Sequence, residues 1–190
     1  MILGITGRVG TGKTTATNQI STLWNAHVVD LDKIGHGVLL KPEIARAISK
    51  AFGPKMLDEG GAVIRTALSQ KVFSSQTSLL KLNDITHPSL KKAAIEEITA
   101  YNEKGRHVVV VGALLIALGL RPYMDKVLVI DAEDTLIQAV VGEKFDRISP
   151  HQISRDAYRR QGDIVIENDH VTFIAKIHAW ATETLAPVSE

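Results

Sequence analysis

Gly7-Arg8-Val9-Gly10-Thr11-Gly12-Lys13-Thr14 is the stretch of this 190-residue chain from which the fold can be inferred. It follows an apolar run at 2–6 and matches the pattern G-x-x-x-x-G-K-[ST] at every fixed position. The glycines leave backbone N–H groups uncovered, so that several of them can reach a phosphate group at once. A helix predicted to begin near Lys13 would point its unpaired N–H groups and positive dipole end at the same phosphates. The pattern therefore predicts a nucleoside triphosphate site.

Two side chains at the end of this stretch have expected roles in the site. Lys13 would place a positive charge beside the β and γ oxygens of the nucleotide, and the Thr14 hydroxyl would be a ligand of Mg²⁺. The alternative is a glycine-rich turn that joins a strand to a helix and binds nothing. The strand, loop and helix occur in the order that the motif requires, which favours the nucleotide site. The loop does not indicate which molecule receives the phosphate.

Two carboxylates follow the second predicted strand, at 27–29. Ligands of an open parallel sheet bind beyond the carboxyl ends of its strands, so Asp30 and Asp32 are expected near the phosphate loop. Side chains alternate along a strand end, which would let both face the nucleotide. Transfer to a hydroxyl needs an aspartate that orients the nucleophile and accepts its proton, and a carboxylate near Mg²⁺. Asp32 is the preferred candidate, whereas Asp30 could instead cap the next helix.

The composition limits the classes of function. Hydrophobic residues make up 45% and charged residues 23%, as in soluble globular proteins. Twenty-two basic and 21 acidic residues leave a net charge of +1, so no overall field favours nucleic acid or an anionic membrane. The chain has no cysteine, which makes a reducing cytoplasm the expected compartment. The uncharged run 108–120 is 13 residues long, short of the roughly 20 that span a bilayer.

Strand and helix patterns alternate along most of the chain. Apolar runs predict five strands, at 2–6, 27–29, 106–111, 126–130 and 163–166. With helical patterns between them, they predict an α/β fold of the P-loop NTPase type, a three-layer α/β/α arrangement around a five-stranded parallel sheet. Residues 41–103 show no strand pattern and are expected to form an all-helical insertion. Within it, His87-Pro88 is expected to separate two helices.

An ordered set of motifs resembles the dephospho-CoA kinase family. After the glycine-rich loop come V-V-D-L-D-K-I-G-H at 28–36, F-G at 52–53, I-R-x-x-L-x-x-x-V-F at 64–73, L-x-x-x-x-H-P at 82–88 and I-V-I-E-N at 164–168. The resemblance spans about residues 1–171. The loop alone is generic, whereas the ordered set of motifs is fairly specific.

The resemblance implies a cytoplasmic kinase that uses ATP and Mg²⁺ to phosphorylate the ribose 3′-hydroxyl of dephospho-coenzyme A, the last step of coenzyme A synthesis. It implies a nucleotide-binding core at 1–40 and 104–190, with a lid at about 142–160, and a helical acceptor-binding insertion at 41–103. The residues that match the family's ATP loop are Gly10, Thr11, Gly12, Lys13, Thr14 and Thr15. Those that match its acceptor side are the base Asp32, the helical-domain residues Arg65 and His87, and the cleft residues Leu114 and Leu115.

Other roles are open for two of these residues. From the residues alone, Arg65 could be a solvated charge on a helix, and His87 could be a histidine whose hydrogen bonds are satisfied in the core.

The chain departs from the family pattern in two places. Family members commonly have P-L-L-F-E after the third strand, often preceded by an acidic residue, whereas this chain has G-A-L-L-I-A at 112–117 and lacks both acidic residues. The segment 138–142 lacks the family's arginine three residues after the glutamine. Basic candidates nearby are Lys144, Arg147, Arg155, Arg159 and Arg160. Arg147 is selected to stabilise transition-state charge, which can be worth ~10³ or more in rate, although such clusters are often solvated faces.

These observations leave three hypotheses of function. The leading one is a dephospho-CoA kinase in which Asp32, Lys13 and Arg147 carry the chemistry. The second is another P-loop kinase that acts on a nucleoside or nucleotide, because such kinases also contain a helical insertion. The third is an ATP-binding protein with weakened catalysis, suggested by the missing acidic residues and the altered lid. In each case the expected partner is a small molecule rather than nucleic acid or a membrane, and no oligomeric state is predicted.

Overall fold

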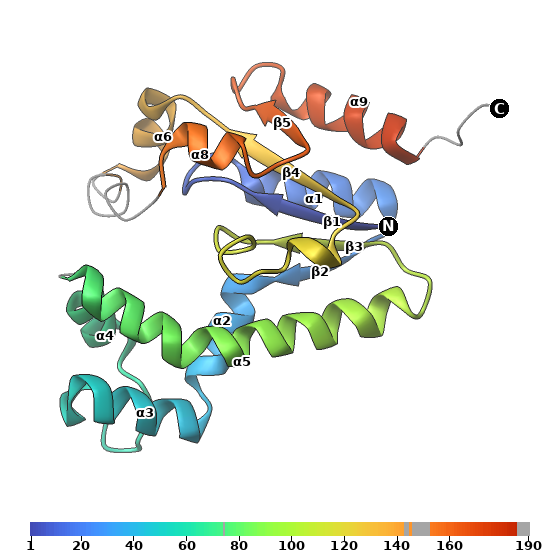
Figure 1. Ribbon diagram of the computed structural model, residues 1–190. Coiled ribbons are helices and arrows are strands. Elements are labelled where there is room, and N and C mark those ends of the chain that lie inside the picture. Colours follow the sequence, from blue (N-terminus) through green and yellow to red (C-terminus); the bar gives the residue numbers. More distant parts are fainter. Residues whose placement is uncertain (74, 143–144, 146–152, 186–190) are drawn as a thin grey trace. The chain divides into compact units, whose positions relative to one another are not determined.

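The computed structural model describes residues 1–73, 75–142, 145 and 153–185 (Figure 1). The chain divides into two compact units. The first unit consists of Met1–Asp30 and Ile95–Glu190, and the second consists of Leu31–Ala94. Both limits of the second unit lie earlier in the chain than the predicted 41 and 103. Among the described residues, none of the helices combines the length and the apolar character needed to cross a bilayer.

The first unit is built on a five-stranded sheet whose neighbouring strands are all parallel. The strands lie in the order β2-β3-β1-β4-β5. In chain order they are β1 (Ile2–Thr6), β2 (His27–Asp30), β3 (Val108–Val111), β4 (Lys126–Asp131) and β5 (Ile164–Glu167). The predicted α/β class and the five parallel strands are confirmed.

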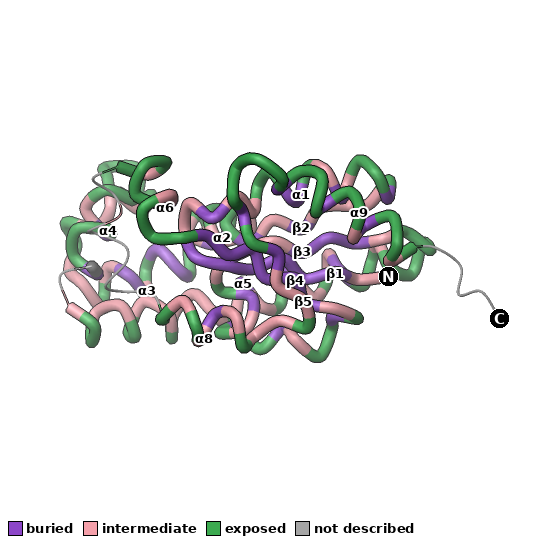
Figure 2. Tube along the Cα trace, turned by 90° about the horizontal axis from the view of Figure 1, so that it is seen from above, coloured by how far each residue is buried: buried purple, intermediate pink, exposed green. Residues whose placement is uncertain are grey.

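Helices and turns cover both faces of the sheet. The helices of this unit include α1 (Lys13–Trp24), α6 (Asp134–Val141), α8 (Arg155–Arg159) and α9 (Phe173–Leu185), with a short 3₁₀ helix η2 (Arg121–Tyr123). Leu3 and Ile5 of β1 pack with α1 and α9 on one face. On the other face, Gly4 lies against Leu115 and Met124, and α8 packs on β4. The three central strands, β1, β3 and β4, are therefore largely buried, as Figure 2 shows, which explains their nearly unbroken apolar sequences.

The position of β1 in the sheet sets the location of the phosphate loop. The chain leaves β1 to form β2 on one side, and it forms β4 and β5 on the other side. The carboxyl end of β1 is thus a topological switch point, which is where open α/β sheets bind ligands. Residues 7–12 follow β1 at this point and lead directly into α1.

The second unit is formed by helices and one short bridge. Its elements are α2 (Leu31–Leu39), α3 (Pro42–Phe52), the 3₁₀ helix η1 (Pro54–Met56), α4 (Arg65–Phe73) and the first part of α5 (Gln76–Asn102). An isolated antiparallel bridge joins Leu57 to Val63 across a turn. Ile48 of α3 and Leu68 and Val72 of α4 are buried. These apolar side chains give the second unit a core of its own.

The predicted break at His87-Pro88 is wrong, because α5 runs continuously through Pro88. Proline removes the N–H that would bond the Asp84 carbonyl, and its ring crowds that carbonyl, at a cost of about 3 kcal/mol. The helix nevertheless buries Leu90, Ala94 and Ile98 at four-residue spacing. Burying one leucine and one isoleucine contributes roughly 3–6 kcal/mol, enough to offset the proline.

Replacing the exposed Pro88 with alanine is expected to stabilise the protein by about 1–3 kcal/mol, because the change restores a helical hydrogen bond and relieves the crowding. Urea unfolding followed by circular dichroism measures the change. Ser89→Ala, one position further along the same helix, is the control and should change stability by less than about 1 kcal/mol. A loss of stability in Pro88→Ala would mean that α5 depends on the proline.

Candidate active site

The backbone of the phosphate loop has a form that suits glycine. Gly10 and Gly12 have φ angles of 78° and 101°, which L side chains rarely adopt. A Cβ atom on Gly12 would lie 2.6 Å from Nδ2 of Asn168, and one on Gly10 would lie 2.7 Å from Cγ1 of Val141. The surrounding protein therefore leaves no room for a side chain at either position. The glycines of the motif are required by the packing of the loop as well as by a phosphate ligand.

The ammonium group of Lys13 folds back over the loop. Its Nζ donates to the carbonyl oxygens of Gly7, at 2.9 Å, and Arg8, at 2.7 Å. The Thr11 hydroxyl donates to the same Arg8 carbonyl at 2.9 Å. Within the described part of the chain, no side chain caps the N-terminus of α1, which follows Gly12. N–H groups at the N-terminus of a helix form a common binding site for anions such as phosphate.

The first turn of α1 offers oxygen ligands to a metal ion. Thr14 and Thr15 are both exposed there. Among the described residues, no group of three or more His, Cys, Asp or Glu could hold a metal. Mg²⁺ commonly binds with one or two protein oxygens and completes its shell with water and substrate phosphates. A single threonine hydroxyl beside a phosphate loop fits a metal that arrives with the nucleotide.

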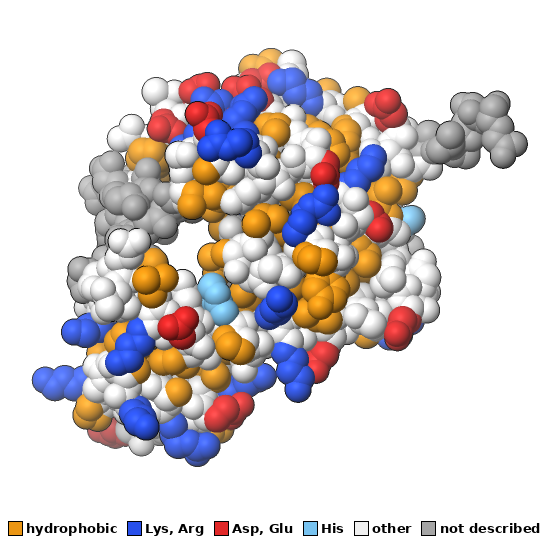
Figure 3. Space-filling model, viewed as in Figure 1, with side chains coloured by type: hydrophobic (Ala, Val, Ile, Leu, Met, Phe, Trp, Pro, Cys, Tyr) orange, Lys and Arg blue, Asp and Glu red, His pale blue; other side chains and the backbone are white. Residues whose placement is uncertain are grey.

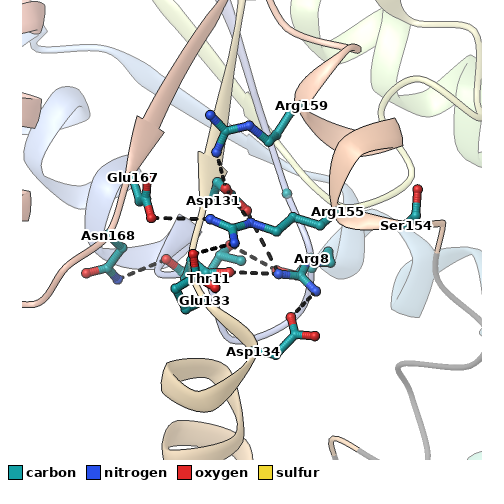
Figure 4. Close-up of polar contacts among 12 residues, drawn as sticks. Arg8, Thr11, Asp131, Glu133, Asp134, Ser154, Arg155, Arg159, Glu167 and Asn168 are labelled. Atoms are coloured by element: carbon teal, nitrogen blue, oxygen red, sulfur yellow. Dashed lines mark hydrogen bonds and ion pairs between the residues drawn. The ribbon is translucent and has the colours of Figure 1, made fainter.

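A buried carboxylate at the end of β4 gathers three arginines (Figure 4). Asp131 is 2% exposed and accepts hydrogen bonds from Nε of Arg155, at 2.8 Å, and Nη1 of Arg159. Nη2 of Arg8 lies 3.9 Å from its other oxygen. A hydrogen bond from Arg155 to Glu133 is the main reason why the pKa of Arg155 is raised. Sequence reasoning missed Asp131, although an aspartate that directly follows a buried strand was the signal used for Asp30.

The end of β5 contacts the phosphate loop from a second direction. Nδ2 of the buried Asn168 donates to the Thr11 carbonyl at 2.9 Å, and its Oδ1 accepts the His170 N–H at 3.0 Å. The motif I-V-I-E-N indicated that this strand belonged to the fold. It did not indicate that its asparagine holds the loop.

Three predicted residues lie in the second unit, and their roles stay predictions. Asp32 is exposed in the first turn of α2, two residues after β2 ends. Nη2 of Arg65 lies 2.6 Å from Nε2 of His36, which must accept the hydrogen bond because arginine can only donate. Burial lowers the pKa of His87, and its Nε2 has no hydrogen-bond partner among the described residues. His87 is half-buried, and both interpretations of its role stay predictions.

The remaining predicted residues differ in what they can offer a ligand. Leu114 is 40% exposed, whereas Leu115 is fully buried against Gly4 of the central strand. Leu114 therefore has side-chain surface that a ligand could contact. Leu115 instead packs the segment against the sheet. Arg147 and most of the predicted lid lie outside the described residues.

The loop joins a central parallel strand to a helix N-terminus and is closed by a lysine that folds back over it, and this arrangement defines a P-loop nucleotide-binding protein. The sequence model of a family described as dephospho-CoA kinase matches residues 1–173. The chain belongs to the dephospho-CoA kinase family. The family predicted from the ordered motifs is confirmed, and with it the enzyme class, a phosphotransferase with an alcohol group as acceptor.

Individual relatives agree with the family match. Dephospho-CoA kinase of Dehalococcoides mccartyi is 35% identical over 132 residues, which cover 69% of this chain and 66% of the relative. That of Burkholderia thailandensis is 32% identical over 179 residues, which cover 90% and 87%. The crystal structure of TT1252 from Thermus thermophilus aligns with a TM-score of 0.77 at 22% identity and covers 98% of each chain. Dephospho-CoA kinase from Campylobacter jejuni aligns with a TM-score of 0.60 at 19% identity, covering 97% and 95%. At these identities the two structures establish the fold alone.

Proposed function

We propose that this chain transfers the γ-phosphoryl group of ATP to the ribose 3′-hydroxyl of dephospho-coenzyme A, the final step of coenzyme A synthesis. The observation that carries the proposal is the complete phosphate loop at the carboxyl end of β1, in a chain whose family is dephospho-CoA kinase. A nucleoside or nucleotide kinase would share the loop, but the family match over residues 1–173 favours dephospho-CoA as the acceptor.

The loop and the start of α1 form the nucleotide side of the site. Residues 10–15 hold the phosphates through backbone N–H groups, and Lys13 supplies a positive charge that meets the charge developing during transfer. Thr14 is the residue that would hold Mg²⁺, which when bound would neutralise charge on the β and γ phosphates. Arg147 is proposed to add transition-state charge from the lid.

The second unit supplies the groups proposed for the acceptor. Asp32 orients the 3′-hydroxyl and accepts its proton. Residues 31–94 contain ten basic and five acidic residues, a net charge of +5, whereas the rest of the chain contains 12 and 16, a net charge of −4. Lysine and arginine side chains of this unit are prominent on the face shown in Figure 3. A positive potential attracts an acceptor that carries a diphosphate, which supports acceptor binding by this unit, with Arg65 and His87 as proposed contacts. Leu114, which belongs to the first unit, is a further proposed contact.

The test is the release of ADP from ATP in the presence of candidate acceptors, followed with a coupled assay. ADP release is expected with dephospho-CoA, with one 3′-phosphorylated product per ADP, and not with nucleosides or nucleoside monophosphates. Transfer to one of those acceptors instead would identify a different P-loop kinase. ATP binding without transfer to any of them would identify a protein with weakened catalysis. Either result overturns the proposal.

A further inference from the structure

We propose that Arg8 is a positioning residue for the transfer reaction: its side chain anchors the phosphate loop to the end of β4, and its backbone carbonyl sets the position of the Lys13 ammonium. The inference rests on the proposed function, because phosphoryl transfer is the activity that the anchor serves. The phosphate-loop pattern allows any residue at position 8, so the arginine is a feature of this chain rather than of the motif.

The first step is the burial of the Arg8 side chain. Arginine is rarely buried unless it is paired, yet the Arg8 side chain is only 9% exposed. Its Nη1 donates to Asp134, and its Nη2 donates to the Ala132 carbonyl at 2.7 Å. Both acceptors lie where β4 passes into α6. A guanidinium makes these two contacts through two different nitrogens held in a planar fork, whereas the donors of an ammonium group all lie on one nitrogen.

The backbone carbonyl group of Arg8 links the same residue to Lys13 and Thr11. The Arg8 oxygen accepts hydrogen bonds from Nζ of Lys13, at 2.7 Å, and from the hydroxyl of Thr11, at 2.9 Å. Lys13 and the middle of the loop therefore depend on where the backbone of residue 8 lies. Because the side chain of Arg8 is tied to β4, the Lys13 ammonium is tied to the sheet through it. A displacement of about 1 Å in a group that contacts the reacting atoms can lower a rate about 10²-fold.

The third step is the rigidity of the anchor point. Besides its 3.9 Å ion pair with Arg8, Asp131 is held by Arg155 and Arg159 of α8. Its backbone carbonyl also accepts the Asn168 N–H at 2.8 Å. The carboxylate beside Arg8 is thus held by two arginines of α8, as Figure 4 shows, and the backbone of Asp131 is held by the residue that follows β5.

The buried ion pairs of Arg8 are not explained by a contribution to stability alone. Its Nε atom is buried and has no hydrogen-bond partner among the described residues. A buried ion pair with an unsatisfied donor is weak evidence for stabilisation, because the desolvation of the charges opposes their attraction. Holding the loop in one position gives a reason for the burial of this side chain that does not depend on stabilisation.

The test compares Arg8→Gln, Lys13→Ala and the double variant. Arg8→Gln is expected to lower kcat about 10- to 100-fold and to leave the KM for dephospho-CoA within about twofold, because the acceptor is not held by the loop. If Arg8 acts through Lys13, the double variant loses no more than Lys13→Ala alone. A purely structural role would instead add its loss to that of Lys13→Ala. An additive double variant, or an Arg8→Gln enzyme within twofold of the original kcat, overturns the inference.

Controls separate loss of the anchor from loss of the fold. Arg121→Gln breaks an ion pair with Asp163 near the opposite end of β4, and it should leave kcat unchanged. If Arg8→Gln does not fold, Arg8→Lys keeps a positive charge beside Asp131, and it should keep the melting temperature while lowering kcat about tenfold. The Kd of ATP, measured by calorimetry without acceptor, should show the same non-additivity. A chain that binds ATP with this coupling but phosphorylates no dephospho-CoA would contradict the proposed function and not the role of Arg8.

Discussion

Replacing Lys13 with alanine is expected to lower kcat for dephospho-CoA phosphorylation by about 10³-fold or more, because the loop loses the positive charge that meets the γ-phosphoryl group in the transition state. The carbonyl oxygens of Gly7 and Arg8 already hold this ammonium over the loop. Its charge is therefore in place before the reaction and needs little reorganisation. Steady-state ADP release measures kcat, and calorimetry measures the accompanying loss of ATP affinity.

A matched variant shows whether the loss belongs to this position. Lys126→Ala removes a lysine from the first residue of β4, at the amino end of the strand, and should leave kcat within about twofold of the original. Equal losses in both variants would point to a general effect of charge on the sheet. A Lys13→Ala enzyme that keeps more than about a tenth of the original kcat would contradict the role assigned to the loop.

Replacing Asp32 with asparagine should lower kcat about 10²- to 10⁴-fold while leaving the Kd of ATP within about twofold, because the amide keeps the shape of the side chain but cannot accept the proton of the 3′-hydroxyl. The two measurements together distinguish a base from a nucleotide ligand. Single-turnover mixing of the enzyme with ATP and dephospho-CoA reports the chemical step directly.

Glu43→Gln provides the control for Asp32→Asn. Asp32 and Glu43 are both acidic residues in the first turn of a helix of the second unit, so both changes remove the same interaction with a helix dipole. Glu43→Gln should leave kcat unchanged. Near-normal turnover by Asp32→Asn would contradict the role of Asp32 as the base and would leave Asp30 as the remaining candidate.

The strands and the phosphate loop could be predicted from the sequence because their signals are local. An apolar run of four to six residues becomes a strand wherever both faces of a sheet are covered, as in β3 and β4. The loop pattern follows from the needs of a phosphate ligand and from backbone angles at Gly10 and Gly12 that the local sequence can adopt.

The break predicted at Pro88 was wrong because the prediction considered only the effect of proline on the helix backbone and not the burial of the residues that follow it. Proline is a strong stop signal when the residues after it have nothing to bury. Here Leu90, Ala94 and Ile98 follow it on one face of α5, and their burial outweighs the lost hydrogen bond. Proline would destabilise α5 as an isolated helix, whereas in the folded protein the packing of its apolar side chains keeps the helix continuous.

The sequence by itself determined the strand–loop–helix unit and the lysine at its end, because these depend on residues that are neighbours along the chain. It also determined the family, because the order of several short motifs along the chain can be read without the fold. Only the tertiary structure decided that Asp131 would meet Arg8, that Asn168 would hold Thr11, and that Leu115 would be buried. Arg8 and Asp134 are 126 positions apart, and Asn168 and Thr11 are 157 apart. Contacts across such separations are set by the order in which parallel strands assemble, and no local pattern of residues records that order.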